Sequence, residues 1–373
     1  MLAAGCPDLA VFGAVGSSDP GTTTRILRRS SVFIFLPLPR GEGRGEGSLP
    51  SLSSPIPPPF LLVHSKPPIL PLTMYTIDMS NPDEVTQTLR DGANANRTAK
   101  CRQGSIDLIK APGHLIASGD THDHPKNFRA IVTAAGLDGE FGSEPKHLTL
   151  HEIIHPDMKQ PLPGAPAPVD TSYRGLTRVA KLKTQYPEFV HFLLANHELA
   201  QAIDSLIVKN GVRCVEAFNA GIDQEFPDPA DAQAVRDAVT DFVFSMPIAL
   251  RAKCPQGDIL CVHSLPGPGM MDRFDTSIIN RDLSDRDYEP RVGSAHLLTW
   301  GRGYDHEQLE DLTERWGINL FILGHEHADN GYTLIEPNAI VLNTDHDKGV
   351  YLPIDLDHKP TLTQAATNLV HIQ

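Results

Sequence analysis

Short apolar runs recur along the chain from about residue 74 onwards, and several of them end abruptly in polar side chains. Four such runs span residues 114–118, 189–194, 258–262 and 318–323, and each is followed within two residues by a carboxylate, an amide or an imidazole. Apolar runs of this length, bounded by glycine or turn residues, are typical of buried strands. Because α/β proteins bind ligands beyond the carboxyl ends of their strands, we predict interior strands with functional groups at their tips.

The segments between these runs have the apolar spacing of helices or of further strands. Predicted helices span residues 82–94 with Asn81 as the cap, 125–136 closed by Gly136, 170–186 capped by Asp170 or Thr171, 199–209, 231–250 and 307–316. Further strands are predicted at 106–109 and 147–155, and residues 331–336, 339–343 and 349–354 are predicted to form a meander that completes a second sheet. The alternation of strand, polar loop and helix indicates the α/β class.

Residues 1–73 differ in texture from the rest of the chain. They are rich in Pro, Gly, Ser and Leu, and neither a helical nor a strand period is visible. The segment 25–39 resembles a signal peptide, but prolines interrupt its apolar run and no small-residue cleavage site follows. We expect residues 1–73 to be disordered or not part of the native folded protein, with Met74 or Met79 as the start, and residues 74–373 to form one domain.

Composition narrows the class of protein. Of 373 residues, 40% are hydrophobic and 21% charged, with a formal net charge of -14. This charge argues against binding to nucleic acid backbones or anionic membranes, so an anionic substrate would need local help from a metal or an arginine. No run reaches the roughly 18 to 20 apolar residues of a membrane span. Five cysteines without a Cys-x-x-Cys pair indicate a reducing, cytoplasmic setting.

The first predicted strand carries the clearest candidate for metal chemistry. Asp120 and His122 follow it and are two residues apart, so in extended backbone their side chains point to the same side. A hard oxygen and a borderline nitrogen that converge on one point suit Zn, Mn or Fe better than the all-oxygen ligand set of calcium. An ordinary polar turn could contain the same short motif. Repetition of such groups at later strand ends favours the metal site.

Later strand ends and loops supply further candidates. In chain order these are Glu152 within the run 147–155, Arg174, Asn196 and His197 after the run 189–194, His263, Arg302 between two glycines, and His325 with His327. The arginine between glycines could reach an anion or could be a solvated turn residue. A lone histidine at a strand end is usually structural, but this one, His263, is accompanied by others.

The ordered series Asp120-x-His122, Glu152, Asn196-His197-Glu198, His263 and Gly324-His325-x-His327 resembles the calcineurin-like metallophosphoesterases over about residues 113–354. Asn196-His197-Glu198, the strand before His263 and Arg302-Gly303 are similar to the branch of serine/threonine phosphoprotein phosphatases. The resemblance implies a four-layer α/β/β/α sandwich with two mixed β-sheets and a metal site at the carboxyl ends of strands.

The resemblance also implies roles for the candidate residues. Asp120 and His122, with His327, would bind one divalent cation; Asn196, His263 and His325 would bind a second; and Glu152 would bridge them. The two cations, which are Mn, Fe or Zn, would clamp a phosphate and activate a water for in-line attack on phosphorus. His197 would protonate the leaving oxygen, and Arg302, with Arg174 as a second clamp, would hold the nonbridging oxygens.

Departures from the family pattern leave alternatives open. Glu152 and His155 stand where the second motif of the family has aspartates, so the carboxylate that supports the catalytic histidine is replaced by an imidazole. The leading expectation is a phosphomonoesterase that acts on a phosphoprotein, as a serine/threonine protein phosphatase does, or on a small phosphate ester. The alternatives are a nucleotide or dinucleoside polyphosphate hydrolase and a catalytically weak, metal-binding regulatory module.

Overall fold

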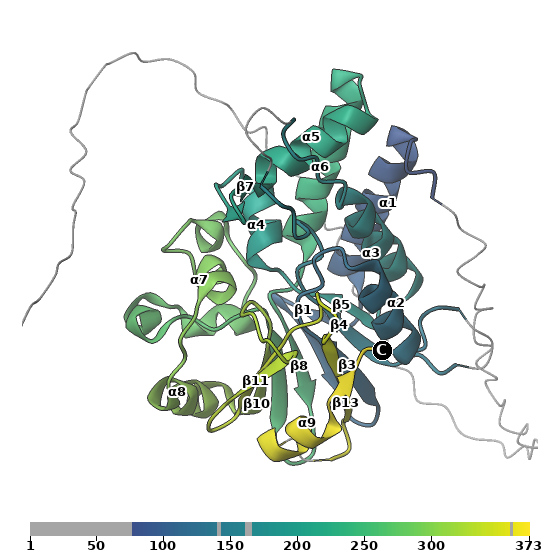
Figure 1. Ribbon diagram of the computed structural model, residues 1–373. Helices are drawn as coiled ribbons and strands as arrows, with labels where there is room; N and C mark the ends of the chain where they lie inside the picture. The colour runs from purple at the N-terminus through teal and green to yellow at the C-terminus, as the bar shows by residue number, and fades with distance from the viewer. Residues whose placement is uncertain (1–76, 140–142, 161–165, 359–360) are drawn as a thin grey trace, which may run out of the picture. The chain divides into compact units, whose positions relative to one another are not determined.

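The computed structural model describes residues 77–139, 143–160, 166–358 and 361–373 (Figure 1). The expectation for residues 1–73 lies outside these ranges. Within them, two large mixed sheets and the helices packed on them confirm the predicted α/β fold. No helix in the described part of the chain is long and apolar enough to cross a lipid bilayer.

The larger sheet has seven strands. In spatial order they are β1 (Arg102–Gln103), β2 (Ile106–Lys110), β8 (Ala249–Lys253), β9 (Asp258–Val262), β10 (Ile318–Leu323), β12 (Ala339–Leu342) and β11 (Tyr332–Ile335). Strand β10 runs parallel to both β9 and β12, whereas β8 and β9 are antiparallel. Parallel pairing places the carboxyl ends of β9 and β10 at the same edge of the sheet.

The smaller sheet has five strands. Their order is β14 (Val370–His371), β13 (Val350–Asp355), β3 (His114–Ser118), β4 (His147–Leu150) and β5 (Val190–Phe192). Strands β3, β4 and β5 are mutually parallel and are connected through α2 (Pro125–Ala134) and α3 (Tyr173–Gln185), so they form two consecutive βαβ units. The loops after these three strands therefore also meet at one edge.

Side chains alternate along the strands between two hydrophobic cores. In β10, Leu320 and Ile322 share a core with Leu115 of β3, which belongs to the other sheet. Phe321 and Leu323 point the other way and join the core that contains the helices. Since successive residues of a strand face opposite sides, this alternation is what a sandwich of two sheets with helices outside requires.

The remaining helices pack on the two sheets and around their edges. They are α1 (Pro82–Thr98), α4 (Asn196–Ala202), α5 (Cys214–Glu225), α6 (Pro229–Ser245), α7 (Ser294–Trp300), α8 (His306–Trp316) and α9 (Leu362–Asn368), with short 3₁₀ turns at Pro268–Arg273, Thr276–Asn280 and Asp285–Tyr288. Figure 1 shows α7 and α8 on one side of the strands and α1, α2 and α3 on the other. The predicted cap of α1 is confirmed, because Asn81 Oδ1 accepts hydrogen bonds from the amides of Asp83 and Glu84.

One of the predicted helices is wrong, because a hairpin forms in its second half. Residues 199–209 do not form a single helix, since α4 begins at Asn196 and ends at Ala202. The chain then forms a two-stranded hairpin from β6 (Val208–Lys209) and β7 (Val212–Arg213). This hairpin lies next to the candidate site described below.

Other boundaries also differ from those predicted. The helix expected at 231–250 ends at Ser245, because the following residues join the larger sheet as β8. The strand expected at 147–155 ends at Leu150, and α3 has Ser172 rather than Asp170 at its N-cap position. Strand β13, expected to continue the meander of β11 and β12, instead pairs with β3 in the smaller sheet.

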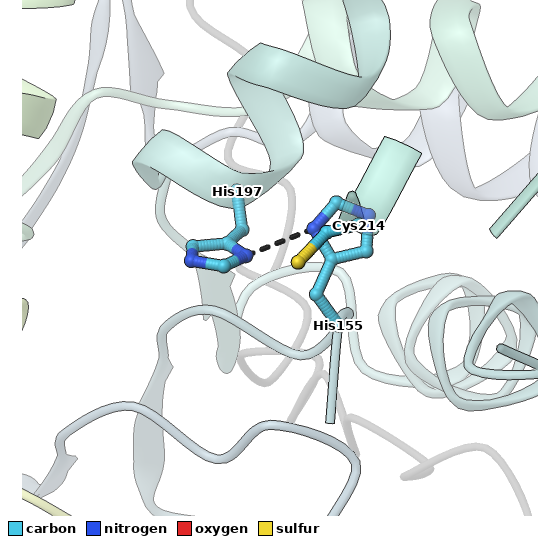
Figure 2. Close-up of side chains that lie close together, drawn as sticks. All are labelled: His155, His197 and Cys214. Carbon is cyan, nitrogen blue, oxygen red and sulfur yellow. Dashed lines mark hydrogen bonds between the residues drawn. The ribbon is translucent and has the colours of Figure 1, made fainter. Parts of the chain in front are cut away.

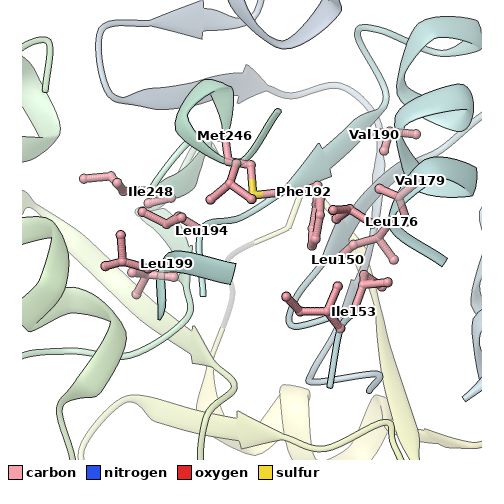
Figure 3. Packing of buried hydrophobic residues seen from close by; sticks show 14 of the residues in the cluster. Leu150, Ile153, Leu176, Val179, Val190, Phe192, Leu194, Leu199, Met246 and Ile248 are labelled. Carbon is pink, nitrogen blue, oxygen red and sulfur yellow. The ribbon is translucent and has the colours of Figure 1, made fainter. Parts of the chain in front are cut away.

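A compact part of the core lies behind the loop that follows β4. Figure 3 shows Leu150 and Ile153 packed close to Leu176 and Val179 of α3 and to Phe192 of β5. All of these side chains are buried. Ile153 in this loop is therefore anchored in the core. Its packing fixes the position of Glu152, which precedes it in the chain.

Candidate metal centre

Five strand ends bring polar side chains to one place. Asp120 follows β3, Glu152 follows β4, Asn196 follows β5, His263 follows β9 and His325 follows β10. Beyond the end of β3, the chain at Asp120 pairs in parallel with His151 on one side and with Asn343 on the other. Both sheets therefore contribute to the site, which explains why its residues are spread over more than 200 positions of the sequence.

The loop after β4 is held in an unusual backbone conformation. Glu152 and His155 have positive φ angles of 38° and 59°. Non-glycine residues rarely adopt such angles, and they do so where the surroundings determine the conformation. Here the Glu152 carbonyl accepts hydrogen bonds from the amides of Thr121 and His122 at 3.1 and 2.8 Å. The buried Glu198 Oε1 accepts two more, from the loop amides of Ile153 and Ile154 at 2.7 and 3.2 Å.

The Glu152 carboxylate lies between two groups of imidazoles. Its Oε1 atom is 3.3 Å from His122 Nε2 and 3.1 Å from His197 Nε2, and its Oε2 atom is 3.1 Å from His263 Nε2. The ligand atoms of His122, Glu152 and His197 all lie within 4.8 Å of one another, and so do those of Glu152, His263 and His325. A carboxylate shared by two such groups is suited to bridge two cations.

Asn196 and Asp120 complete the cluster. Asn196 Oδ1 is 2.7 Å from His263 Nε2 and 3.0 Å from His325 Nδ1. Asp120 Oδ2 accepts a hydrogen bond from the His325 amide at 2.8 Å, and its Oδ1 atom is 3.5 Å from His263 Nδ1. Six of the seven predicted metal ligands therefore lie in one contiguous, largely buried cluster: Asp120, His122, Glu152, Asn196, His263 and His325.

Several atoms of this cluster lack hydrogen-bond partners. Among the described residues, Asp120 Oδ1, His263 Nδ1 and His325 Nε2 are buried and have none. More than nine in ten buried polar groups in native proteins are paired, so each exception needs an explanation. Carboxylate oxygens and neutral imidazole nitrogens are the usual ligands of Zn, Mn and Fe. The residues of the cluster therefore fit divalent cations.

Electrostatics favour the same interpretation. Burial raises the pKa of Glu152 to about 8, and burial together with the charge of Glu152 raises the pKa of Asp120. Burial also lowers the pKa of His263 to about 3. Burial disfavours ionisation of the two acids and protonation of the imidazole, because the cluster lacks a compensating charge. A divalent cation would supply positive charge to the carboxylates and would bind the neutral imidazoles.

His197 is held by His155 rather than by a carboxylate. Figure 2 shows the two rings joined at their Nδ1 atoms, which are 2.8 Å apart, with Cys214 beside them. His155 Nε2 lies 3.3 Å from Gln201 Oε1, and Gln201 Nε2 donates to Asn219 Oδ1 at 2.9 Å. Since Gln201 Oε1 can only accept, His155 carries its proton on Nε2 and accepts at Nδ1. His197 therefore donates from Nδ1, and its Nε2 faces Glu152.

The predicted anion-binding arginines are placed very differently. Arg302 is exposed, and its guanidinium donates to the carbonyl of the ligand candidate His325 at 3.2 Å, so it lies at the rim of the cluster. Arg174 instead forms an ion pair with Glu225 and also donates to the hydroxyl of Tyr173. The structure does not bring Arg174 to the cluster.

His327 is also kept apart from the other predicted ligands. Its side chain is 68% exposed, and its Nε2 atom is 3.2 Å from Asp329 Oδ1. It belongs to none of the groups of neighbouring ligand atoms found among the described residues. The backbone of His325, with a φ of 70°, turns sharply between the two histidines. This turn keeps one imidazole in the cluster and leaves the other in solvent.

Two residues that the sequence did not single out lie at the site. Both ring nitrogens of the buried His151 lack partners, and its ligand atom lies within 4.8 Å of those of Asp120 and His263. Asp345 follows the residues paired with Asp120 and has a buried Oδ1 without a partner. The position of His151 next to Glu152 was a usable signal, whereas nothing in the local sequence indicated Asp345.

No protein-family model matches the sequence, and a search of curated proteins finds no similar sequence. Among solved structures, the chain is similar to a protein serine/threonine phosphatase from Saccharomyces cerevisiae, itself described as similar to human phosphatase PP5. The TM-score is 0.54 at 13% identity, over 78% of this chain and 88% of that one. The chain therefore shares its fold with this phosphatase.

The shared fold bears out the two mixed sheets expected from the resemblance in sequence. A cold-active protein-tyrosine phosphatase of a psychrophilic Shewanella species is also similar, with a TM-score of 0.49 and 13% identity over 74% of this chain and 85% of that one. At such identities the likeness concerns the fold. The chemistry has to be argued from the side chains of the cluster.

Proposed function

We propose that this chain is a metal-dependent phosphoesterase that hydrolyses phosphate monoesters with the help of two divalent cations. The observation that carries the proposal is the Glu152 carboxylate, which lies between two groups of ligand atoms and beside unpartnered buried atoms of Asp120, His263 and His325. Two cations bound by these two groups would hold the phosphate and activate the attacking water.

The proposed role of His197 follows from its position. Its Nε2 atom points toward the cluster, and Nδ1 is engaged by His155, so the imidazole can move a proton only on the side of the substrate. In the reaction a P–O bond to the attacking water forms and the P–O bond to the leaving group breaks. His197 Nε2 takes up the proton that the water loses and passes it to the leaving oxygen. A regulatory module that catalyses no reaction would not need the His197 imidazole to be held in this orientation. The orientation therefore favours an enzyme over a regulatory module.

The guanidinium of Arg302 would bind the nonbridging oxygens of the substrate. It lies at the rim, where it donates to the carbonyl of His325. Its planar array of donors matches the geometry of a phosphate, and such charge-assisted contacts hold the ester in line for attack. This placement supports a role in substrate binding, whereas the ion pair of Arg174 with Glu225 removes the reason to propose one for Arg174.

Finer features remain part of the proposal. We favour Mn, Fe or Zn as the metals because the ligands mix carboxylate, amide and imidazole groups. We favour phosphoproteins, with phosphoserine or phosphothreonine, and small phosphate esters as substrates. A cytoplasmic location is supported by the four described cysteines, which are buried and unpaired: Cys101, Cys214, Cys254 and Cys261.

The test is hydrolysis of p-nitrophenyl phosphate and its bis-ester with added Mn²⁺. We expect the monoester to be hydrolysed, and His197→Ala to lower kcat by about 10²- to 10⁴-fold because the proton donor is lost. Asp120→Asn should lower both metal content and kcat. His306→Ala and Asp311→Asn on the exposed face of α8 are matched controls that should leave the rate unchanged.

Metal analysis of the same samples separates the alternatives. If the wild type holds two cations per chain but hydrolyses neither substrate, nor phosphopeptides or dinucleoside polyphosphates, the proposal of an enzyme fails and the regulatory module is favoured. If only the polyphosphates are hydrolysed, the metal centre stands and the class of substrate changes.

A further inference from the structure

The hairpin of β6 and β7 covers one side of the candidate site. Its turn, Asn210–Gly211, has positive φ angles of 51° and 77°, as a tight hairpin turn requires. A Cβ atom added at Gly211 would lie 2.8 Å from Gln160 Oε1, so the turn packs directly on the loop that follows β4. This loop also carries Glu152 and His155, and the hairpin is thus fixed to the segment that shapes the cluster.

Lys209 projects from this hairpin toward the same loop. Its Nζ atom is 2.8 Å from Asp157 Oδ1, two residues after His155. The Lys209 side chain is 23% exposed, and the carboxylate that anchors it is 70% exposed. On the other flank, Cys214 begins α5 directly after the hairpin, and its Sγ atom lies within 4.8 Å of ring nitrogens of His155 and His197. The ion pair therefore holds the ammonium group on the loop that also carries Glu152 and His155.

An anionic substrate would need a cation at this position. The chain has a net charge of -14, and the cluster itself contains the two buried carboxyl groups of Asp120 and Glu152. Arg302 lies next to His325, on the part of the rim built by β10. Arg174, expected as a second clamp, is engaged by Glu225. The side of the cluster built by the loop after β4 thus has no arginine clamp among the described residues.

We propose that Lys209 is a substrate-binding residue that holds the nonbridging oxygens of the phosphate from the hairpin side, a role that it shares with Arg302 at the rim. An ammonium group has three donors, and Asp157 accepts only one, so two remain to bind an anion. The ion pair positions the flexible lysine without neutralising its capacity to donate. This inference rests on the proposed function, because it assigns the anion-binding group of the same site.

The same hairpin supplies a matched control. Arg213 lies in β7 and pairs across the hairpin with Val208, but its guanidinium forms an exposed ion pair with Glu216 at 2.7 Å. Arg213→Gln removes one positive charge from the hairpin without touching the site. Lys209→Met removes the other charge and retains most of the side-chain volume, and Lys209→Arg keeps the charge.

Two measurements on the metal-loaded protein test the inference. The first is titration calorimetry with inorganic phosphate, and the second is the kinetics of p-nitrophenyl phosphate hydrolysis. We expect Lys209→Met to weaken phosphate binding and raise KM by roughly 10- to 100-fold, the effect of losing a charge-assisted contact, with a smaller change in kcat. Lys209→Arg should recover most of the binding, and Arg213→Gln should bind phosphate as the wild type does.

The outcomes distinguish this inference from the proposed function. If the wild type is active and Lys209→Met behaves as Arg213→Gln does, the role of Lys209 is refuted while the phosphoesterase stands. If Lys209→Met loses kcat and metal content but binds phosphate normally, the residue is structural and the inference also fails. If the wild type is inactive but its phosphate binding depends on Lys209, the inference stands and the proposed enzyme does not.

Discussion

Two buried clusters of acidic and imidazole groups link the sheets of this protein, and they differ in whether their atoms have partners. The first surrounds Glu152 and leaves Asp120 Oδ1 without a partner. The second surrounds Asp107 of β2, whose Oδ2 accepts from His191 Nδ1 of β5 at 2.8 Å and whose Oδ1 accepts from Arg102 Nε at 3.0 Å. Each cluster thus joins a strand of one sheet to a strand of the other.

Positive charge accounts for the difference. In the second cluster the fully buried Lys183 lies 3.9 Å from Asp107 and donates to the carbonyls of Pro187 and Val190 at 2.7 and 2.8 Å. Burial alone would raise the pKa of Asp107, but the hydrogen bond and charge of His191, with Lys183 and Arg102, outweigh it and lower the value to about 2. The first cluster has no comparable cation within it, so its acids have raised pKa values.

The comparison shows that proximity of ligand atoms alone does not make a metal site. Cys101, Asp107 and His191 also present ligand atoms within 4.8 Å of one another. The Asp107 carboxylate is already neutralised by Lys183 and Arg102, and these two charges would repel a further cation. Unpartnered atoms, and the lack of a neutralising lysine or arginine among the described residues, are the reasons to propose the Glu152 cluster rather than the Asp107 cluster as the metal site.

The largest expected contrast is in stability without metal. Asp107→Ala should lower the free energy of unfolding by about 3–5 kcal/mol, because it leaves the buried Lys183 and Arg102 without their counter-charge. Asp120→Asn should change it by less than about 1 kcal/mol, since the mutant amide still offers an acceptor to the His325 amide and a like-charge contact with Glu152 is removed. Urea unfolding of chelator-treated protein, followed by circular dichroism, measures both. Equal losses would remove the distinction between the clusters.

A smaller effect is expected from metal binding. Mn²⁺ at about 100 times its Kd should raise the free energy of unfolding by about 2.7 kcal/mol, since only the folded state holds the ligands together. Glu152→Ala should abolish most of this gain, and Cys101→Ala in the second cluster should retain it. Thermal unfolding with and without Mn²⁺ gives the shift. Loss of the metal effect in Cys101→Ala would mean that the wrong cluster has been assigned.

The smallest effect concerns pH and the second cluster. His147 Nδ1 lies 3.1 Å from His191 Nε2, and burial, with the charge of His191, lowers the pKa of His147 from 6.5 to about 3. Between these values the unfolded chain binds a proton that the folded chain does not, so stability should fall as pH falls, by up to about 1.4 kcal/mol per pH unit. His147→Gln should remove this part of the slope. Urea midpoints at pH 6.5, 5.5 and 4.5 test it, and an unchanged slope would exclude the contribution of His147.

Local sequence predicted the elements that deliver the site. The apolar runs ending near Asp120, Asn196, His263 and His325 are strands, as their short length and the turn residues beside them predicted. The order of the motifs indicated the family whose fold the structure confirms. The hairpin of β6 and β7 was missed, since its strands have only two residues each and leave no period to detect.

Only long-range packing decided which candidates meet. Arg174 and His327 satisfied the same sequence criteria as their neighbours, yet an ion pair with Glu225 and a turn at His325 direct them elsewhere. Lys209 had no motif, and it reaches Asp157 in the loop after β4 because its hairpin packs on that loop.

The sequence by itself therefore determined where strands end and which chemical groups stand at their tips, because hydrophobic period and residue type are local properties. The tertiary structure decided that Glu152 is shared between two groups of ligands and that Asp107 is not available to a metal. Both outcomes depend on charges brought together from strands of different sheets, such as β2 with β5 and β4 with β9. No local pattern encodes such a distance, since it is fixed only when the two sheets pack.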